Sequence, residues 1–280
     1  MSSPDLSELL AKVTEVVERA GVLLSEEWNR PDGPRGWGDK AVIDVEIERI
    51  LRPALLSLLS CDFGGEETGH VLTGHAWCWV VDPNDGTSDF LKGLKGSAVS
   101  VGLLHNAIPV LGVVHAPVTS SGLPDCISWV EGNPHLIRNG QTIGVFLADK
   151  KLSSDSTIMV SAAAVNNPEL NRQLCSPGQF HAMPSIAYRL ARVAAGDAVC
   201  GVSLYAVSAH DVVAGHALLR GAGGVLLDEN GVAIRYATKA NMITVSQRCF
   251  GGSPSVCHEL ATREWDQVFR SSAIDHKSDA

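Results

Sequence analysis

The chain has 280 residues, enough to bury a sizeable core in one domain or two closely packed ones. Hydrophobic residues make up 45% of the chain and charged residues 19%, which excludes disorder except at the ends. The net charge of −9, without a dense run of Lys and Arg, argues against a surface that binds a nucleic-acid polymer.

The first 60 residues predict two helices. Apolar residues recur at helical spacing from Leu6 to Leu24. A loop rich in Pro and Gly follows at 31–36, and a second helix from Ile43 to Leu55 contains Pro53, where it could kink. Asp44 stands at the start of this second helix. There it is either a solvated carboxylate beside the free amides or part of a functional site.

The segment Gly64-Gly65-Glu66-Glu67 follows a short apolar stretch. Taken alone, its two glutamates fit a solvated loop.

A second acidic segment follows the apolar run 77–81, which predicts a buried strand. It reads Asp82-Pro83-Asn84-Asp85-Gly86-Thr87. Pro-Asn-Asp-Gly is a strong turn sequence in its own right. Two carboxylates at a strand end can also share a hard cation such as Mg²⁺, which is bound by oxygen ligands. The amides of Gly86 and Thr87 could then hold a phosphate.

The rest of the chain predicts strands first and then alternating strands and helices. Strands are expected at 97–105, 109–116, 127–130 and 136–143, with a turn at Asn139-Gly140. After Lys150, strands are expected at 157–161, 199–202, 224–227 and 242–245, and helices at 168–174, 186–195, 212–220 and 255–269. We therefore expect an α+β half over residues 1–150, an α/β half over 151–270 and a flexible tail at 271–280.

A third acidic position lies at Ala209-His210-Asp211, where the helix around 212–220 opens. Asp211 is typical of an N-cap, because Asp accepts hydrogen bonds from the free amides of a helix start. A capping Asp can still turn its second oxygen towards a metal ion.

Seven cysteines, without a Cys-x-x-Cys pair, indicate small buried hydrophobic residues rather than structural zinc or a disulfide framework. Every apolar run is shorter than a membrane span, and the N-terminus lacks the pattern of a signal peptide. These features predict a cytoplasmic protein with no membrane partner.

Together the three acidic motifs resemble the lithium-sensitive, Mg²⁺-dependent phosphatases of the inositol monophosphatase superfamily. That family carries Gly-Glu-Glu, Asp-Pro-x-Asp-Gly-Thr and Trp-Asp-x-x-Ala-Gly, followed by Gly-Gly-Val-Leu. The matching segments are 65–67, 82–87, 210–215 and 223–226. The resemblance covers roughly residues 5–270. It implies a layered α-β-α-β-α sandwich of the inositol monophosphatase/fructose-1,6-bisphosphatase type, an active site between the halves, and a homodimer.

The resemblance also implies roles for single residues around two or three Mg²⁺ ions. One phosphate dianion cannot sit among four carboxylates unless cations neutralise them. The implied metal ligands are Glu66, Asp82, Asp85, Asp211 and the carbonyl of Asn84. The implied catalytic residues are Glu66, Thr87 and Asp44, and the implied substrate-binding residues are Gly86, Thr87, Ser161 and His210.

The chain departs from the family pattern at three positions. Ala41 replaces the Thr of the usual Thr-x-x-Asp, although Asp44 is kept. His210 replaces the signature Trp, either touching substrate or packing as a non-catalytic ring. Leu204 replaces the Glu that grips ring hydroxyls in inositol-specific members, which disfavours inositol phosphate.

Other segments, 109–117 and 167–170 with Ser161, look closer to the 3′-phosphoadenosine 5′-phosphate phosphatases, but that branch's Pro-Thr-x-Glu-Trp-Asp is absent. We therefore expect a phosphomonoesterase acting on a small phosphate ester, either a nucleotide 3′-phosphate such as 3′-phosphoadenosine 5′-phosphate or a sugar phosphate. The alternatives are an inositol 1-phosphate phosphatase and a catalytically weak relative that binds a phosphorylated metabolite. Three basic residues are either surface charges, which is the favoured reading, or further anion contacts: Lys92, Lys95 and Arg189.

Overall fold

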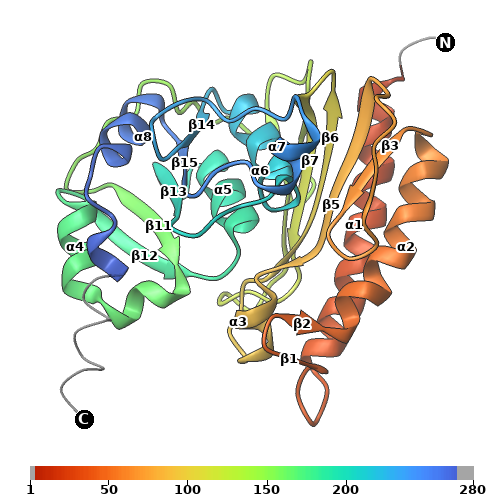
Figure 1. The fold of residues 1–280 in the computed structure, drawn as a ribbon, viewed down its shortest axis with the longest axis horizontal. Helices are drawn as coiled ribbons and strands as arrows, with labels where there is room; N and C mark the ends of the chain where they lie inside the picture. The colour runs from red at the N-terminus through yellow and green to blue at the C-terminus, as the bar shows by residue number, and fades with distance from the viewer. Residues whose placement is uncertain (1–3, 270–280) are drawn as a thin grey trace.

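The computed structural model describes residues 4–269 and stacks them in five layers, in the order α-β-α-β-α (Figure 1). The predicted fold class is confirmed. The outermost layer contains α1 (Leu6–Trp28) and α2 (Val42–Leu58), which pack on one face of a large sheet. Pro53 lies inside α2.

The large sheet has eight strands in the order β10-β9-β8-β7-β6-β5-β3-β4. Only β3 and β5 run parallel; the other neighbours are antiparallel. Its strands are β3 (Asp62–Gly65), β4 (His70–Val71), β5 (Trp77–Asp85), β6 (Ala98–His105), β7 (Ile108–Ala116), β8 (Asp125–Val130), β9 (Leu136–Arg138) and β10 (Gln141–Ile143). A small hairpin, β1 (Gly36–Trp37) with β2 (Lys40–Ala41), precedes α2.

Strand β5 is buried on both faces, and its side chains alternate between two cores. Trp79 and Val81 pack towards α1 and α2, whereas Cys78 and Val80 pack towards the opposite face. That opposite face is covered by α5 (Ile186–Ala194) and α6 (Ala209–Gly221), the middle layer. By the same alternation, Asp82 is directed towards the layer that contains α6.

The second sheet has five strands in the order β12-β11-β13-β15-β14. Strands β11, β12 and β13 are parallel, and β15 is antiparallel to β13 and β14. The strands are β11 (Thr157–Ser161), β12 (Gln179–Met183), β13 (Cys200–Ser203), β14 (Val225–Asp228) and β15 (Cys249–Gly252). The short helix η1 (Ala162–Asn166) follows β11, and α4 (Pro168–Cys175) and α8 (Pro254–Ala261) form the last layer.

A network of charged side chains joins the large sheet to the middle layer. Arg138 of β9 pairs with Asp125 of β8 (2.7 Å) and with Asp197 beyond α5 (2.8 Å). Arg192 of α5 also pairs with Asp197 (2.7 Å), and the Tyr188 hydroxyl donates to Asp125 (2.8 Å). The middle layer is therefore attached to the large sheet by ion pairs as well as by the shared apolar core.

Two sequence-based expectations for the last third of the chain are wrong. The strand expected at 242–245 is instead the end of α7 (Lys239–Ile243), which the Thr238 hydroxyl caps by accepting from the amide of Asn241 (3.1 Å). The true strand is β15, which the glycine pair Gly251-Gly252 concealed. A Cβ on Gly251 would lie 2.3 Å from Leu190 Cδ2, so close packing excludes a side chain there.

The helix expected at 255–269 ends at Ala261, and β12 was not expected at all. The tail predicted at 271–280 lies outside the described residues. Within residues 4–269, the helices are too short or too polar to cross a membrane.

Candidate metal and active site

The carboxylates of Asp82 and Asp85 meet because β5 is irregular where they lie. In a regular strand, residues three apart point to opposite faces. The register of β5 against β6 shifts between these two residues, as in a β-bulge. Oxygens of Asp82, Asp85 and Asp211 consequently lie within 4.8 Å of one another. Asp82 and Asp85 are both buried, so this group of three is largely removed from bulk water.

Asp85 is held from behind by the second half of the chain. Its Oδ2 accepts hydrogen bonds from Ser185 Oγ (2.5 Å) and from the amide of Ala187 (2.6 Å), at the start of α5. Burial and the charge of Asp211 raise the pKa of Asp85 to about 6 against these bonds. Ser185 was missed by sequence reasoning, although a Ser directly before the helical pattern at 186–195 is a typical cap.

Arg189, a sequence candidate for an anion contact, is buried instead. Its guanidinium donates to the carbonyls of Ser185 (3.2 Å) and Val202 (2.6 Å). The expected anion contact is wrong, because both bonds point into the core. Lys92 lies 3.8 Å from Asp89.

Asp44 is a buried partner of the 82–87 segment, so the reading of a solvated carboxylate is wrong. It is 1% exposed, and its oxygens accept from Asn84 Nδ2 (2.9 Å) and Thr87 Oγ1 (2.9 Å). Burial raises the pKa of Asp44 to about 6, while these two hydrogen bonds lower it. Gly86 has φ +97°, and a Cβ there would lie 3.1 Å from the amide nitrogen of Ser185, so the turn into α3 (Thr87–Leu91) requires glycine.

Glu66 approaches the group from the end of β3. Its amide donates to the carbonyl of Val81 (3.2 Å), which aligns it with β5. Its side chain is 34% exposed, and a carboxylate oxygen lies within 4.8 Å of ligand atoms of Asp82 and His210. Burial, followed by the charges of Asp211, Glu67 and Asp44, raises the pKa of Glu66 to about 8, against a hydrogen bond with Asp82.

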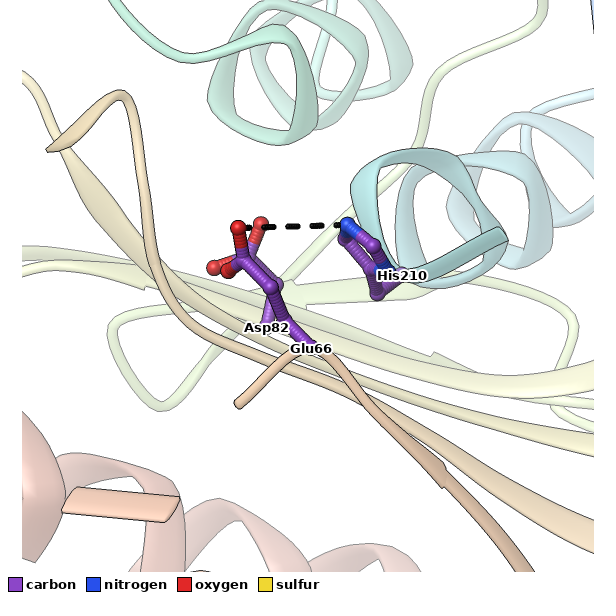
Figure 2. A group of neighbouring side chains, drawn as sticks. All are labelled: Glu66, Asp82 and His210. Carbon is purple, nitrogen blue, oxygen red and sulfur yellow. Dashed lines mark ion pairs between the residues drawn. The ribbon is translucent and has the colours of Figure 1, made fainter. Parts of the chain in front are cut away.

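His210 and Asp211 open α6 on the opposite side of the group. Asp211 is not the N-cap that the sequence predicts; Ser208 is, and its amide donates to Asp211 Oδ2 (2.5 Å). The ring of His210 points towards Glu66, with 4.0 Å between Nε2 and Glu66 Oε1 and 3.7 Å to Asp211 Oδ1 (Figure 2). Burial lowers the pKa of His210 to about 4, so the ring is neutral at pH 7. The sequence analysis named His210 as a substrate-binding candidate and not as a metal ligand.

The donor set fits a hard divalent cation. Four carboxylates converge, and burial raises the pKa of each one, that of Asp82 well above its ordinary value. The raised pKa values mean that the four charges are unfavourable together without a compensating cation. Among residues 4–269, Asn84 Oδ1 is also buried without a hydrogen-bond donor. Oxygen-rich sites of this kind suit Mg²⁺.

Ser161 lies apart from the carboxylates, at the carboxyl end of β11. It lines a cavity of about 150 Å³ together with Leu204, Tyr205, Asn171 and Phe269. The rings of Tyr205 and Phe269 meet edge to face, with centroids 5.6 Å apart. Ser161 is paired in register with Met183, two residues before Ser185. Ser161 therefore lies at the same carboxyl end of the parallel strands as the loop after β12 that holds Asp85.

Comparisons with known proteins converge on one family. A model of the inositol monophosphatase family matches residues 5–268. The chain is 29% identical over 202 residues to a probable inositol 1-monophosphatase ImpA of Mycobacterium tuberculosis, covering 66% of this chain and 70% of that one. It is 26% identical over 278 residues to the 3′(2′),5′-bisphosphate nucleotidase CysQ of Aggregatibacter actinomycetemcomitans, covering 95% and 98%.

Solved structures share the fold. The inositol monophosphatase of Anabaena superposes with a TM-score of 0.70 at 22% identity, over 91% of this chain and 94% of that one. CysQ of Bacteroides thetaiotaomicron superposes with a TM-score of 0.68 at 20% identity, over 89% and 98%.

Proposed function

The chain belongs to the inositol monophosphatase family of phosphoric monoester hydrolases, and we propose that its substrate is a small phosphorylated nucleoside or sugar. The observation that carries this proposal is the meeting of Asp82, Asp85 and Asp211 within 4.8 Å, with Glu66 beside them. Magnesium dependence is general in the family. Here the side chains of those four residues and the carbonyl of Asn84 would hold two or three Mg²⁺ ions.

Bound metal would lower the pKa of a water and polarise the phosphoryl oxygens. Side chains and amides of the protein would orient the attacking water and the phosphate. Thr87 Oγ1 donates to Asp44 Oδ2, which leaves a lone pair on Oγ1 to accept from the attacking water. Asp44 accepts this hydrogen bond as a buried carboxylate and so fixes the direction of the Thr87 hydroxyl. In the proposal Glu66 orients the same water, and the amides of Gly86 and Thr87 bind phosphate oxygens.

The alternative of a catalytically weak relative is motivated by the loss of the usual Thr at Ala41 and of the signature Trp at His210. The contact of Thr87 with Asp44 forms without a hydroxyl at position 41. This supports an active enzyme over a binding protein.

Substrate choice is proposed from the cavity that Ser161 and Leu204 line. Leu204 is buried and apolar, so it cannot accept a hydrogen bond from a ring hydroxyl of inositol. The similarity to a bisphosphate nucleotidase over almost the whole of both chains favours a nucleotide 3′-phosphate such as 3′-phosphoadenosine 5′-phosphate. In the proposal Ser161 and His210 contact the organic part of the substrate.

Phosphate release from a panel of substrates tests this proposal. The panel contains 3′-phosphoadenosine 5′-phosphate, sugar phosphates and inositol 1-phosphate, each with Mg²⁺ and with EDTA. We expect the highest kcat/KM for a nucleotide or sugar phosphate and loss of turnover in EDTA. A higher kcat/KM for inositol 1-phosphate would reject the substrate assignment. Full turnover in EDTA would reject the metal assignment, and binding without turnover would favour a phosphometabolite-binding protein.

A further inference from the structure

Helix α2 contacts both acidic segments through side chains spaced four residues apart. Asp44, Glu48 and Arg52 fall on one face of the helix, because residues i and i+4 lie one above the other. Asp44 reaches the 82–87 segment, as described above. Glu48 and Arg52 reach the 66–68 segment instead, which follows β3. One helix face therefore contacts both segments.

Glu48 is fully buried, and both of its carboxylate oxygens accept hydrogen bonds from the two residues after Glu66. Oε2 accepts from the amide of Glu67 (2.8 Å). Oε1 accepts from the amide of Thr68 (2.7 Å) and from its hydroxyl (2.5 Å). A buried carboxylate is unfavourable unless donors satisfy it, and charge-assisted bonds of this kind are the strong ones.

Arg52 completes the arrangement from the next turn of α2. Its Nη1 donates to the hydroxyl of Thr68 (2.8 Å) and to the carbonyl of the same residue (3.1 Å). Its guanidinium lies over the ring of Phe63 in β3, 4.8 Å from the centroid. The Thr68 hydroxyl accepts from Arg52 and donates to Glu48, so its proton has a defined direction.

Glu48 packs so close to Gly65 that there is no room for a side chain at that position. A Cβ on Gly65 would lie 2.1 Å from Glu48 Oε1 and 2.7 Å from Phe63 Cε1, so a side chain there would force Glu48 to move. The glycine before Glu66 is thus required by the approach of Glu48. The peptide groups on both sides of Glu66 are fixed, one by the carbonyl of Val81 and the other by Glu48.

We propose that Glu48 is a positioning residue that presets Glu66 for a divalent cation without touching the cation or the substrate. Together with Asp44, it would keep the 66–68 and 82–87 segments in register through one helix face. This inference rests on the proposed function, in which Glu66 is a metal ligand. Groups that orient metal ligands in this way change metal affinity or activity by about 10- to 100-fold when they are altered.

The test compares Glu48→Gln with Glu46→Gln. Gln keeps the size of Glu48 but turns one acceptor into an NH₂ group that meets an N–H donor. Glu46 lies on the same helix, has 46% of its side chain exposed and pairs with Arg35, so its change removes the same charge outside the contact. Calorimetry with Mg²⁺ alone measures affinity, and hydrogen exchange measures the amides of Glu67 and Thr68.

We expect Glu48→Gln to weaken Mg²⁺ binding and raise the half-activating Mg²⁺ concentration about 10- to 100-fold. KM for the phosphate ester should stay within about twofold, because Glu48 does not touch it. The two amides should exchange faster, and Glu46→Gln should match the parent. Parental Mg²⁺ affinity in a folded Glu48→Gln protein would overturn the positioning role, even if the melting temperature fell.

Two further variants keep the test decisive. Thr68→Val removes only the hydroxyl between Glu48 and Arg52 and should weaken Mg²⁺ binding in the same direction, even if Glu48→Gln does not fold. In a Glu66→Gln background, Glu48→Gln should have no further effect on Mg²⁺ affinity, because the two act as one unit. Additive effects would overturn the inference. A parent that binds Mg²⁺ but releases no phosphate would instead overturn the proposed function.

Discussion

The two acidic segments reach the same site by different routes. The 82–87 segment ends a nine-residue strand, and its aspartates are buried. Its geometry comes largely from its own backbone, through the bulge and the left-handed Gly86. The 66–68 segment follows a four-residue strand, and Glu66 has about a third of its side chain exposed. Hydrogen bonds with Glu48 and Arg52 of α2 hold its backbone in place. A ligand can thus be placed by local backbone or by a distant helix.

The largest expected effect concerns the locally built segment. Asp85→Asn keeps size and shape but removes one charge from the group. Because a bound metal stabilises transition-state charge by several kcal/mol, kcat/KM should fall by at least about 1000-fold. Asp89→Asn, in α3 two residues after the segment and outside the group, is the matched control and should keep near-parental kcat/KM. Near-parental turnover of Asp85→Asn at saturating Mg²⁺ would reject a metal-binding role for 82–87 and leave the segment as an ordinary turn.

The two segments should also differ in the pH dependence of metal-free stability. Folding raises the pKa of Asp85 from 3.8 to about 6, so the folded state holds more protons and loses stability as pH rises through that window. Asn cannot ionise. The stability advantage of Asp85→Asn should therefore be near zero at low pH and grow to on the order of 3 kcal/mol above pH 6.

Folding raises the pKa of Glu66 from 4.5 to about 8, so the stability advantage of metal-free Glu66→Gln should grow over that pH range. Urea unfolding of metal-free parent and variants across this pH range measures both. A constant difference between parent and variant would show that neither carboxylate is destabilised in the fold. Saturating Mg²⁺ should reverse the sign for both variants, because the parent then gains the binding energy of the metal.

A smaller effect is expected at the glycines that precede Glu66. Gly65→Ala forces Glu48 to move and should cost about 1–3 kcal/mol, as overpacking does. In Gly64→Ala the new Cβ would lie 3.0 Å from the exposed ring of His70, which can shift, and in ordinary contact with Met242 (3.4 Å), so the change should cost less than about 1 kcal/mol. Urea midpoints decide between them. Equal losses at the two glycines would mean that the contact with Glu48 is not what restricts position 65.

The sequence predicted the parts of the site that short motifs encode. Asp82, Asp85 and Asp211 were identified because each belongs to a contiguous pattern, and the layered fold followed from the resemblance. Glu48 was missed because it is 20 residues from Thr68, and Ser185 because it is 100 residues from Asp85. Periodicity predicts which face of a helix is buried, but not which distant loop that face will meet.

Local propensity failed for a related reason at 239–252. An apolar run around Met242 predicted a strand, yet the Thr238 cap begins a short helix there. The real strand carries Gly251 and Gly252, which score poorly for strand formation but are demanded by tight packing. In both cases tertiary contacts overrode the local preference.

The ion pairs of Arg138 and Arg192 bear on how product leaves the enzyme. They join the large sheet to α5 and to the residues directly after it, beside a shared apolar core, so any motion that separated α5 from the large sheet would break several charged contacts. Motion that opens the site is then expected in short surface segments. The β1–β2 hairpin, with Trp37 90% exposed, is the kind of element that can move while the scaffold stays rigid. We therefore expect product to leave through movement of short surface segments and not through separation of the middle layer from the large sheet.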